Sequence, residues 1–207
     1  MTLLRILYGS LCDLWKRGLR DYFLRVTASF FLLALIFFGA GMLFPSLQER
    51  LWSILSSSMA NVGAYSDDGS IKALPIFLNN LSACFFILLY GLLPFVRIGA
   101  LSLGLNAMSL GTMAVWYLTN GISLSVLFAG VVPHGLIEFP ALFLFLAMSL
   151  YTCDQLSRRW RRDEEAHSLR GCAVLSLRLY SLVLVPLLAV AAWIESAITP
   201  LFISLFS

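Results

Sequence analysis

Charged residues are sparse along the chain and leave long apolar intervals between them. The longest interval lies between Arg97 and Glu138 and is interrupted by the turn-forming sequence Thr119-Asn120-Gly121. Because a helix needs about 20 mostly apolar residues to cross a bilayer, this interval has room for two antiparallel spans and the other intervals for one each. The pattern predicts five transmembrane helices, near residues 24–44, 74–96, 97–118, 122–150 and 177–198.

The composition agrees with this interpretation. Of the 207 residues, 60% are hydrophobic and 12% are charged, whereas a soluble domain usually carries about a quarter charged residues. The sequence therefore predicts an all-α polytopic membrane protein in which residues 1–207 form a single membrane domain surrounded by the lipid bilayer. In a membrane protein the basic residues chiefly indicate which loops are cytoplasmic, so a net charge of +3 does not indicate an acidic partner. We therefore expect no binding of nucleic acid.

The basic residues are distributed unevenly between the two ends of the predicted spans. Of the 14 lysines and arginines, 12 lie in residues 1–25, at Arg97 or in residues 151–178. Only Arg50 and Lys72 lie on the other side. Because cytoplasmic loops carry the excess of basic residues, we predict a multi-pass protein of the plasma membrane with a cytoplasmic N-terminus and an extracytoplasmic C-terminus.

Two of the segments outside the spans are predicted to lie on the cytoplasmic side. Residues 1–23 have leucines at helical spacing and basic residues between them, which predicts an amphipathic helix at the membrane surface. Residues 151–176 form a basic linker that contains the block Arg158-Arg159-Trp160-Arg161-Arg162. That block is suited either to anionic lipid headgroups or to a cytosolic partner.

Residues 45–73 form the predicted extracytoplasmic loop. Apolar residues recur at helical spacing over residues 46–60, so we expect a short amphipathic helix there, followed by a turn around Asp67-Asp68-Gly69. Two interpretations of the helix remain open. It either packs on the outer surface of the protein or provides a docking site for an extracytoplasmic partner.

The fourth predicted span contains an ionisable pair beside residues that disturb helices. His134 and Glu138 are four residues apart, so they share one face wherever the segment is helical. Pro133 and Pro140 each lack a backbone donor, and Gly135 weakens the turn between them. We therefore predict a helix break that lines a cavity or packs against protein, because lipid offers no partner for freed carbonyl groups.

Six polar residues are predicted to lie in the outer half of the bilayer, where ionisable groups are costly and face protein or water. They are Asn79, Asn80, Asn106, His134, Glu138 and Glu195. Because all six fall in one leaflet, we predict a single polar cluster. The cluster either hydrogen-bonds the helices to one another or binds a ligand, an ion or a proton.

No motif for a cofactor, a metal ion or a catalytic nucleophile is found. The four cysteines match no metal-binding spacing and predict no disulfide framework. His134, Glu138 and Glu195 would make three ligands, but a catalytic zinc site usually has more nitrogen donors. We therefore expect no metal, no cofactor, no catalytic residue and no enzymatic activity.

Three segments resemble the stage II sporulation protein M family of integral membrane proteins. Residues 133–141 are similar to that family's Pro-His-Gly-x-x-Glu-x-Pro-Ala signature, and Leu78-Asn79-Asn80 to its Asn-Asn start. Residues 191–200 resemble its Ala-Ala-x-Ile-Glu-Ala-x-x-Thr-Pro ending, with Trp193 and Ser196 as small departures, and Asn106 matches a mid-helix Asn. The resemblance covers most of the chain from about residue 20 onward.

The resemblance implies a multi-pass plasma-membrane protein that is not itself a catalyst. Founding members act in spore engulfment, where they anchor and localise partners that degrade septal peptidoglycan, and relatives also occur in bacteria that form no spores. Our first hypothesis is therefore a membrane scaffold for envelope proteins, in which the chain also forms a homodimer. The alternative is a small transporter or channel that uses His134, Glu138 and Glu195.

Overall fold

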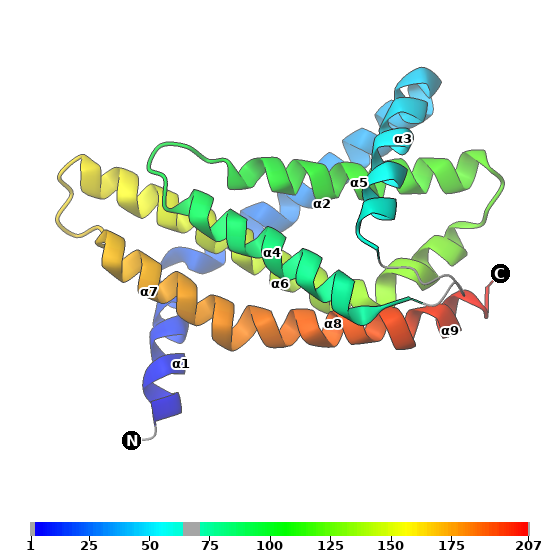
Figure 1. The fold of residues 1–207 in the computed structure, drawn as a ribbon. Coiled ribbons are helices and arrows are strands. Elements are labelled where there is room, and N and C mark those ends of the chain that lie inside the picture. The colour runs from blue at the N-terminus through cyan, green and yellow to red at the C-terminus, as the bar shows by residue number, and fades with distance from the viewer. Residues whose placement is uncertain (1–2, 64–70, 207) are drawn as a thin grey trace. The chain divides into compact units, whose positions relative to one another are not determined.

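The computed structural model describes residues 3–63 and 71–206, and in these residues the chain is helical with no β-strand (Figure 1). The α-helices are α1 (Leu3–Leu14), α2 (Arg20–Leu43), α3 (Pro45–Asn61), α4 (Ala73–Gly91), α5 (Gly99–Thr119), α6 (Leu124–Trp160), α7 (Leu169–Leu179), α8 (Val185–Ala197) and α9 (Thr199–Ile203). Two short π-helical turns, Trp15–Leu19 and Tyr180–Leu184, join α1 to α2 and α7 to α8. The all-α prediction is confirmed.

Five helical segments of the described chain are long and apolar enough to cross a membrane, as the sequence predicted. They are Tyr8–Leu43, Ala73–Gly91, Gly99–Thr119, Leu124–Trp160 and Leu169–Ala197. The protein is therefore a multi-pass membrane protein. The helix predicted over residues 46–60 is also present, as α3, whereas the turn predicted at Asp67-Asp68-Gly69 lies outside the described residues.

Three predicted helix ends differ from the structure. The second span ends at Gly91 rather than at residue 96, and the linker predicted over residues 151–176 is mostly helix, because α6 continues to Trp160 and α7 begins at Leu169. Ser168 caps α7 by accepting a hydrogen bond from the Gly171 backbone N–H. The distance between charged residues gives only the length of an apolar stretch. A helix whose end lies in water continues past that stretch, so the charges do not mark its last residue.

The chain divides into two compact units, each of which is described here by itself. Unit 1 comprises residues 1–28, 82–103 and 140–186, and unit 2 comprises residues 29–81, 104–139 and 187–207. The single membrane domain remains a prediction.

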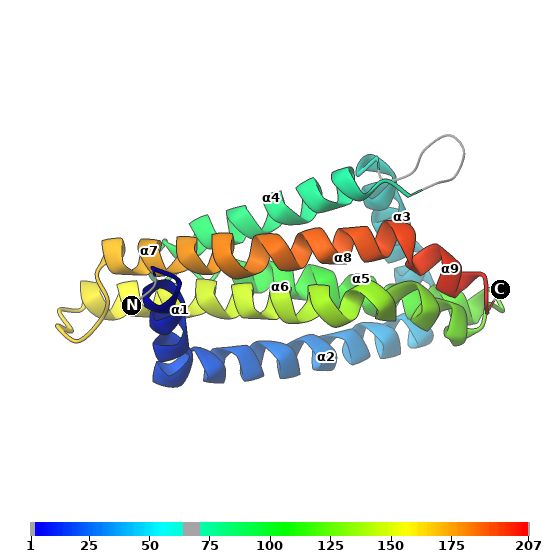
Figure 2. The same ribbon diagram turned by 90° about the horizontal axis from the view of Figure 1, so that it is seen from below.

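In unit 1, the N-terminal helix does not continue straight into α2. Gly18, in the π-helical turn, has a φ of +132°, which favours glycine, and the chain changes direction there (Figures 1 and 2). The helix α1 contacts α7, where the Arg178 guanidinium donates a hydrogen bond to the Ser10 hydroxyl. The amphipathic helix predicted over residues 1–23 is therefore two helical pieces joined by a turn.

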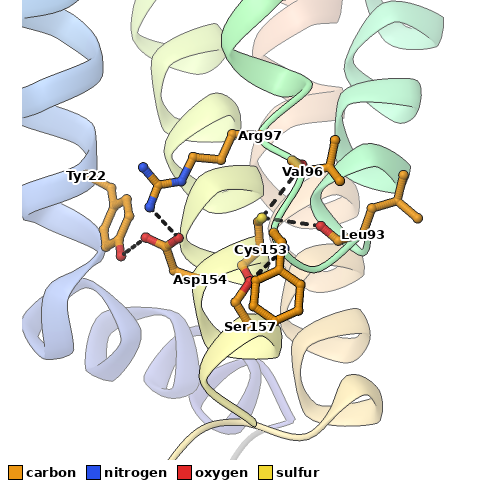
Figure 3. A network of polar contacts seen from close by, with 8 residues as sticks. Tyr22, Leu93, Val96, Arg97, Cys153, Asp154 and Ser157 are labelled. Carbon is orange, nitrogen blue, oxygen red and sulfur yellow. Dashed lines mark hydrogen bonds and ion pairs between the residues drawn. The ribbon is translucent and has the colours of Figure 1, made fainter. Parts of the chain in front are cut away.

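The turn between α4 and α5, also in unit 1, is held by side chains of α6 (Figure 3). The Cys153 thiol donates hydrogen bonds to the carbonyl oxygens of Leu93 and Val96, and the Phe95 backbone N–H donates to the Ser157 hydroxyl at 2.7 Å. Phe95 has a φ of +67°, which is rare for a residue with a side chain. These contacts hold the turn that follows the end of α4 at Gly91.

In unit 2, α3 packs against α5 through one stacked pair and one buried hydrogen bond. The rings of Trp52 and Trp116 lie 4.3 Å apart between centroids and are inclined by 11°. The Gln48 side-chain amide donates to the Thr112 carbonyl at 2.9 Å. A side chain at Gly41 would meet the Gln48 oxygen at 2.6 Å, so this glycine makes room for the buried amide.

Unit 2 also contains a close approach between α5 and α2. A Cβ atom added at Gly111 would lie 2.5 Å from the Ala34 carbonyl oxygen and 2.9 Å from the Phe38 backbone nitrogen. Membrane helices often meet at small residues because these let the two backbones come close. The absence of a side chain at Gly111 is therefore required for this packing.

Candidate functional site

Five of the six predicted polar residues surround one pocket of unit 2. The pocket has a volume of about 190 Å³ and is formed by α3, the start of α4, the first half of α6 and the end of α8. Its lining residues are Met59, Val62, Ile76, Asn79, Asn80, His134, Glu138 and Glu195. Asn106 does not line this pocket and is exposed on α5. Five of the six residues predicted to cluster therefore lie together, and Asn106 lies apart from them.

His134 and Glu138 share one face of α6 because the helix is regular at this point. The break predicted at Pro133, Gly135 and Pro140 is wrong, since α6 runs without interruption through its 37 residues. Each proline removes one backbone hydrogen bond, and the bonds on both sides of it keep a long helix continuous. His134 and Glu138 are thus aligned one turn apart, facing the pocket.

Two asparagine side chains of α4 form a chain of hydrogen bonds that ends at the Glu138 carboxylate of α6. The Asn80 amide donates to Glu138 Oε1 at 3.0 Å, and the Asn79 amide donates to the Asn80 side-chain oxygen at 3.3 Å. Glu195, from α8, completes the group. One ring nitrogen of His134 and one carboxylate oxygen of each glutamate lie within 4.8 Å of one another.

Thr199 also contacts the site through His134. It belongs to the quoted motif at residues 191–200 and was not among the predicted site residues. Its hydroxyl is buried at the start of α9, lies 3.4 Å from Nδ1 of His134 and also lies 3.4 Å from the Ile194 carbonyl, to which it donates. The signal that could have found it is the spacing of Thr199 four residues after Glu195, which places both near the same helix end. The Thr199 hydroxyl thus contacts the imidazole ring.

The electrostatics of the pocket are unbalanced. Glu138 and Glu195 are both half-buried, and the described residues that line the pocket include no lysine or arginine. Two carboxylates this close cannot both remain ionised without a compensating positive charge. The pocket is therefore suited to protons or to a cation.

Comparison with protein-family models identifies residues 27–200 as a match to the family described as Stage II sporulation protein M. The chain belongs to this family. The matched residues include every polar residue of the pocket. No curated protein and no solved structure matches the chain.

A second polar network lies in unit 1 and was missed in the sequence analysis (Figure 3). Asp154, on α6, accepts a hydrogen bond from the Tyr22 hydroxyl at 2.7 Å and forms an ion pair with Arg97 at 2.8 Å. The hydrogen bond and charge of Asp154 raise the pKa of the Arg97 guanidinium above its usual value. Of these three residues, Tyr22 precedes the segment that matches the Stage II sporulation protein M family.

The same network borders a larger, open pocket of about 650 Å³ that includes Arg158 and Arg161. The Arg161 guanidinium lies 5.4 Å from the centre of the Phe95 ring, within range of a cation–π interaction. The Arg158 guanidinium forms an ion pair with Asp163 and donates a hydrogen bond to it. This hydrogen bond lowers the pKa of Asp163 below its usual value. From the sequence, these arginines were interpreted as markers of orientation and as a block for anionic headgroups or a cytosolic partner. The overlooked signal was Asp154, an acidic residue near the end of an apolar helix.

We expect Asp154→Asn to lower the free energy of unfolding by about 1–2 kcal/mol, because one acceptor of two hydrogen bonds loses its charge. The effect is limited because the Arg97 side chain is 63% exposed and therefore screened by solvent. Unfolding in mixed detergent micelles measures it, and a double-mutant cycle with Tyr22→Phe isolates the hydrogen bond. If the two substitutions are additive, Tyr22 and Asp154 are not coupled and the network is not a unit.

Proposed function

We propose that the protein is an integral membrane scaffold that recruits or localises envelope proteins involved in peptidoglycan remodelling. Membership of the Stage II sporulation protein M family supports this role. The observation that carries it is the structure of α3, which is held firmly on one side and open on the other. A binding surface of this kind needs no catalytic group, and we propose that the protein is not an enzyme.

One face of α3 is fixed by contacts within unit 2. The Trp52–Trp116 stack and the Gln48–Thr112 hydrogen bond attach it to α5, and Leu55 is buried beneath it. The opposite face is exposed and carries charged and hydroxyl groups together with the apolar side chain of Ile54. Its exposed polar residues include Glu49, Arg50, Ser53, Ser57, Ser58 and Asn61. A rigid polar surface of this kind costs little ordering entropy when a partner binds.

The orientation predicted from the basic residues is part of this proposal. With a cytoplasmic N-terminus in the plasma membrane, α3 follows the first span and lies on the extracytoplasmic side. It then faces the compartment that contains peptidoglycan. The proposed partners are accordingly membrane or extracytoplasmic envelope proteins, and the chain itself is proposed to form a homodimer.

The scaffold proposal predicts that charge reversal on α3 abolishes partner capture. The tagged protein is purified from its native membranes in mild detergent, and co-purifying envelope proteins are quantified by mass spectrometry. We expect the double variant Glu49→Arg/Arg50→Glu to lose at least about 90% of its specific partners, because like charges then face each other across the interface.

The matched control is Glu164→Lys/Arg170→Glu, a reversal of two exposed charges near the α6–α7 loop. This variant is expected to retain the wild-type set of partners. Both variants are first shown to fold by their unfolding transitions. Wild-type capture by a folded Glu49→Arg/Arg50→Glu variant would contradict α3 as the docking element.

Transport is the second candidate function, and the pocket geometry is the observation that favours it. The pocket gathers His134, Glu138 and Glu195 between predicted spans, as in transporters that move protons or ions past intramembrane carboxylates. Proton or solute flux into proteoliposomes that disappears in Glu138→Gln and persists in Glu49→Gln supports this function. The absence of flux in the wild-type protein counts against it.

A further inference from the structure

We propose that His134, Glu138 and Glu195 form a binding site for a divalent transition-metal ion, with Zn²⁺ as the expected occupant. One donor atom from each residue lies within 4.8 Å of the other two. Donor atoms bound to tetrahedral Zn²⁺ at about 2.1 Å are about 3.4 Å apart. Rotations of the three side chains that move each donor atom by about 1 Å therefore bring the group to binding distance.

The backbone provides the arrangement that helical metal sites use. His134 and Glu138 are one turn apart on the regular helix α6, the same spacing that places two ligands on one face in helical zinc motifs. The third ligand comes from a second helix, α8. Ligands from two helices fix the metal position better than neighbours on one helix do, because their separation depends on helix packing.

The charge of the pocket favours a cation. Glu138 and Glu195 are half-buried within the same pocket, and its described lining residues include no lysine or arginine. A divalent ion compensates both carboxylates at once, and it also accepts an imidazole nitrogen, which a proton-sharing carboxylate pair does not require. His134 is therefore explained by a metal better than by protonation of the glutamates alone.

The residues around the three ligands have the chemistry of a metal-site outer shell. Metal-bound carboxylates and imidazoles are usually hydrogen-bonded to neighbouring groups that orient them. The Asn80 amide donates to Glu138 at 3.0 Å, and the Thr199 hydroxyl lies 3.4 Å from Nδ1 of His134. Both groups hold the ligands without competing for the ion.

The donor set selects the type of metal. Mg²⁺ and Ca²⁺ prefer oxygen ligands alone, whereas one imidazole nitrogen with two carboxylates suits Zn²⁺ and its first-row neighbours. Three protein ligands leave a fourth position open toward the pocket volume of about 190 Å³, which has room for water. The proposal departs from the expectation of no metal, which was based on the shortage of nitrogen donors for a catalytic zinc site, because it concerns binding alone and rests on the proximity of the three donor atoms. It does not depend on the scaffold role.

The test uses the full chain in mild detergent, in a Cys12→Ser background that removes an exposed thiol. After treatment with a chelator, Zn²⁺ binding is measured by equilibrium dialysis and elemental analysis. We expect one Zn²⁺ per wild-type chain and no saturable binding of Mg²⁺ at the same concentrations. His134→Gln, Glu138→Gln and Glu195→Gln are each expected to raise the Kd for Zn²⁺ at least about tenfold.

His167→Gln and Glu165→Gln are the matched controls, because they remove the same side-chain types outside the pocket. They are expected to bind Zn²⁺ as the wild type does. Zn²⁺ is also expected to raise the unfolding temperature of the wild type and of both controls, and not that of Glu138→Gln. Glu195→Asp retains a carboxylate and reports on the site if Glu195→Gln fails to fold.

Two outcomes overturn the proposal. One is a folded wild-type chain that binds no Zn²⁺, whether or not Glu138 supports proton flux. The other is unchanged Zn²⁺ affinity and stoichiometry in the folded variants of all three ligands, which would place the ion elsewhere in the chain.

Discussion

Gly111→Ala is expected to lower the free energy of unfolding by about 2 kcal/mol, the typical cost of inserting a methyl group into closed packing. The new Cβ atom would meet the Ala34 carbonyl oxygen at 2.5 Å and the Phe38 backbone nitrogen at 2.9 Å. These are backbone atoms and cannot rotate aside, so α2 and α5 must separate within unit 2. Unfolding in mixed detergent micelles measures the change, and Gly111→Val is expected to reduce folded yield further.

Gly104→Ala is the matched control on the same helix. A Cβ atom added at Gly104 meets nothing within 4 Å, and alanine loses less conformational entropy than glycine when a helix forms. We expect this variant to be neutral or more stable by up to about 1 kcal/mol. If Gly111→Ala and Gly104→Ala have equal stability, the close approach of α5 to α2 is not present in the folded protein.

Trp52→Ala is expected to lower the free energy of unfolding by about 2 kcal/mol. Removal of a fully buried tryptophan typically costs about 3–5 kcal/mol, and the value is smaller here because Trp52 is half-buried. The substitution removes its stack on Trp116 and leaves the Gln48–Thr112 hydrogen bond as the main polar attachment of α3 to α5. The same unfolding assay measures the change.

Hydrogen exchange of the α3 amides identifies the element that Trp52→Ala releases. We expect faster exchange over Pro45–Asn61 than in the wild type. Ile54→Ala serves as the control because Ile54 is 58% exposed on the same helix. Equal exchange in both variants would show that the tryptophan stack does not hold α3 in place. Because the scaffold proposal requires a fixed surface, Trp52→Ala should also weaken partner capture.

The fold was largely predictable because membrane insertion imposes a strong constraint on sequence. A spanning helix must be long and nearly uncharged, and the apolar intervals therefore identified all five spans. The ends of these helices were harder to predict from the sequence. The turn after α4 is held by hydrogen bonds with α6, in which the Cys153 thiol donates and the Ser157 hydroxyl accepts, and such contacts between distant residues leave no local signal.

The residues of the candidate site could be predicted from the sequence, but their arrangement in space could not. Ionisable residues inside a span are costly, which singled out His134, Glu138 and Glu195, and the structure gathers them within one pocket. The exposure of Asn106 depends on which face of α5 packs inward, and depth along a span does not report that. Pro133 was overinterpreted, because a long helix remains continuous when a single hydrogen bond is lost.

The network of Tyr22, Arg97 and Asp154 was missed for a different reason. Charges at the ends of spans were assigned to orientation, which explains their number and not their contacts. Arg97 and Asp154 are 57 residues apart in the chain, so their pairing depends on the packing of unit 1.

Cross-linking in the native membrane tests most directly the claim that unit 2 gathers the intramembrane polar side chains. Glu138→Cys and Glu195→Cys are combined in a chain whose four native cysteines are replaced by serine, and a short bifunctional thiol reagent is added. We predict rapid cross-linking of this pair and little cross-linking of Leu136→Cys with Glu195→Cys, since Leu136 is 71% exposed on the same helix. Equal rates for the two pairs, or no link between positions 138 and 195, would contradict the pocket.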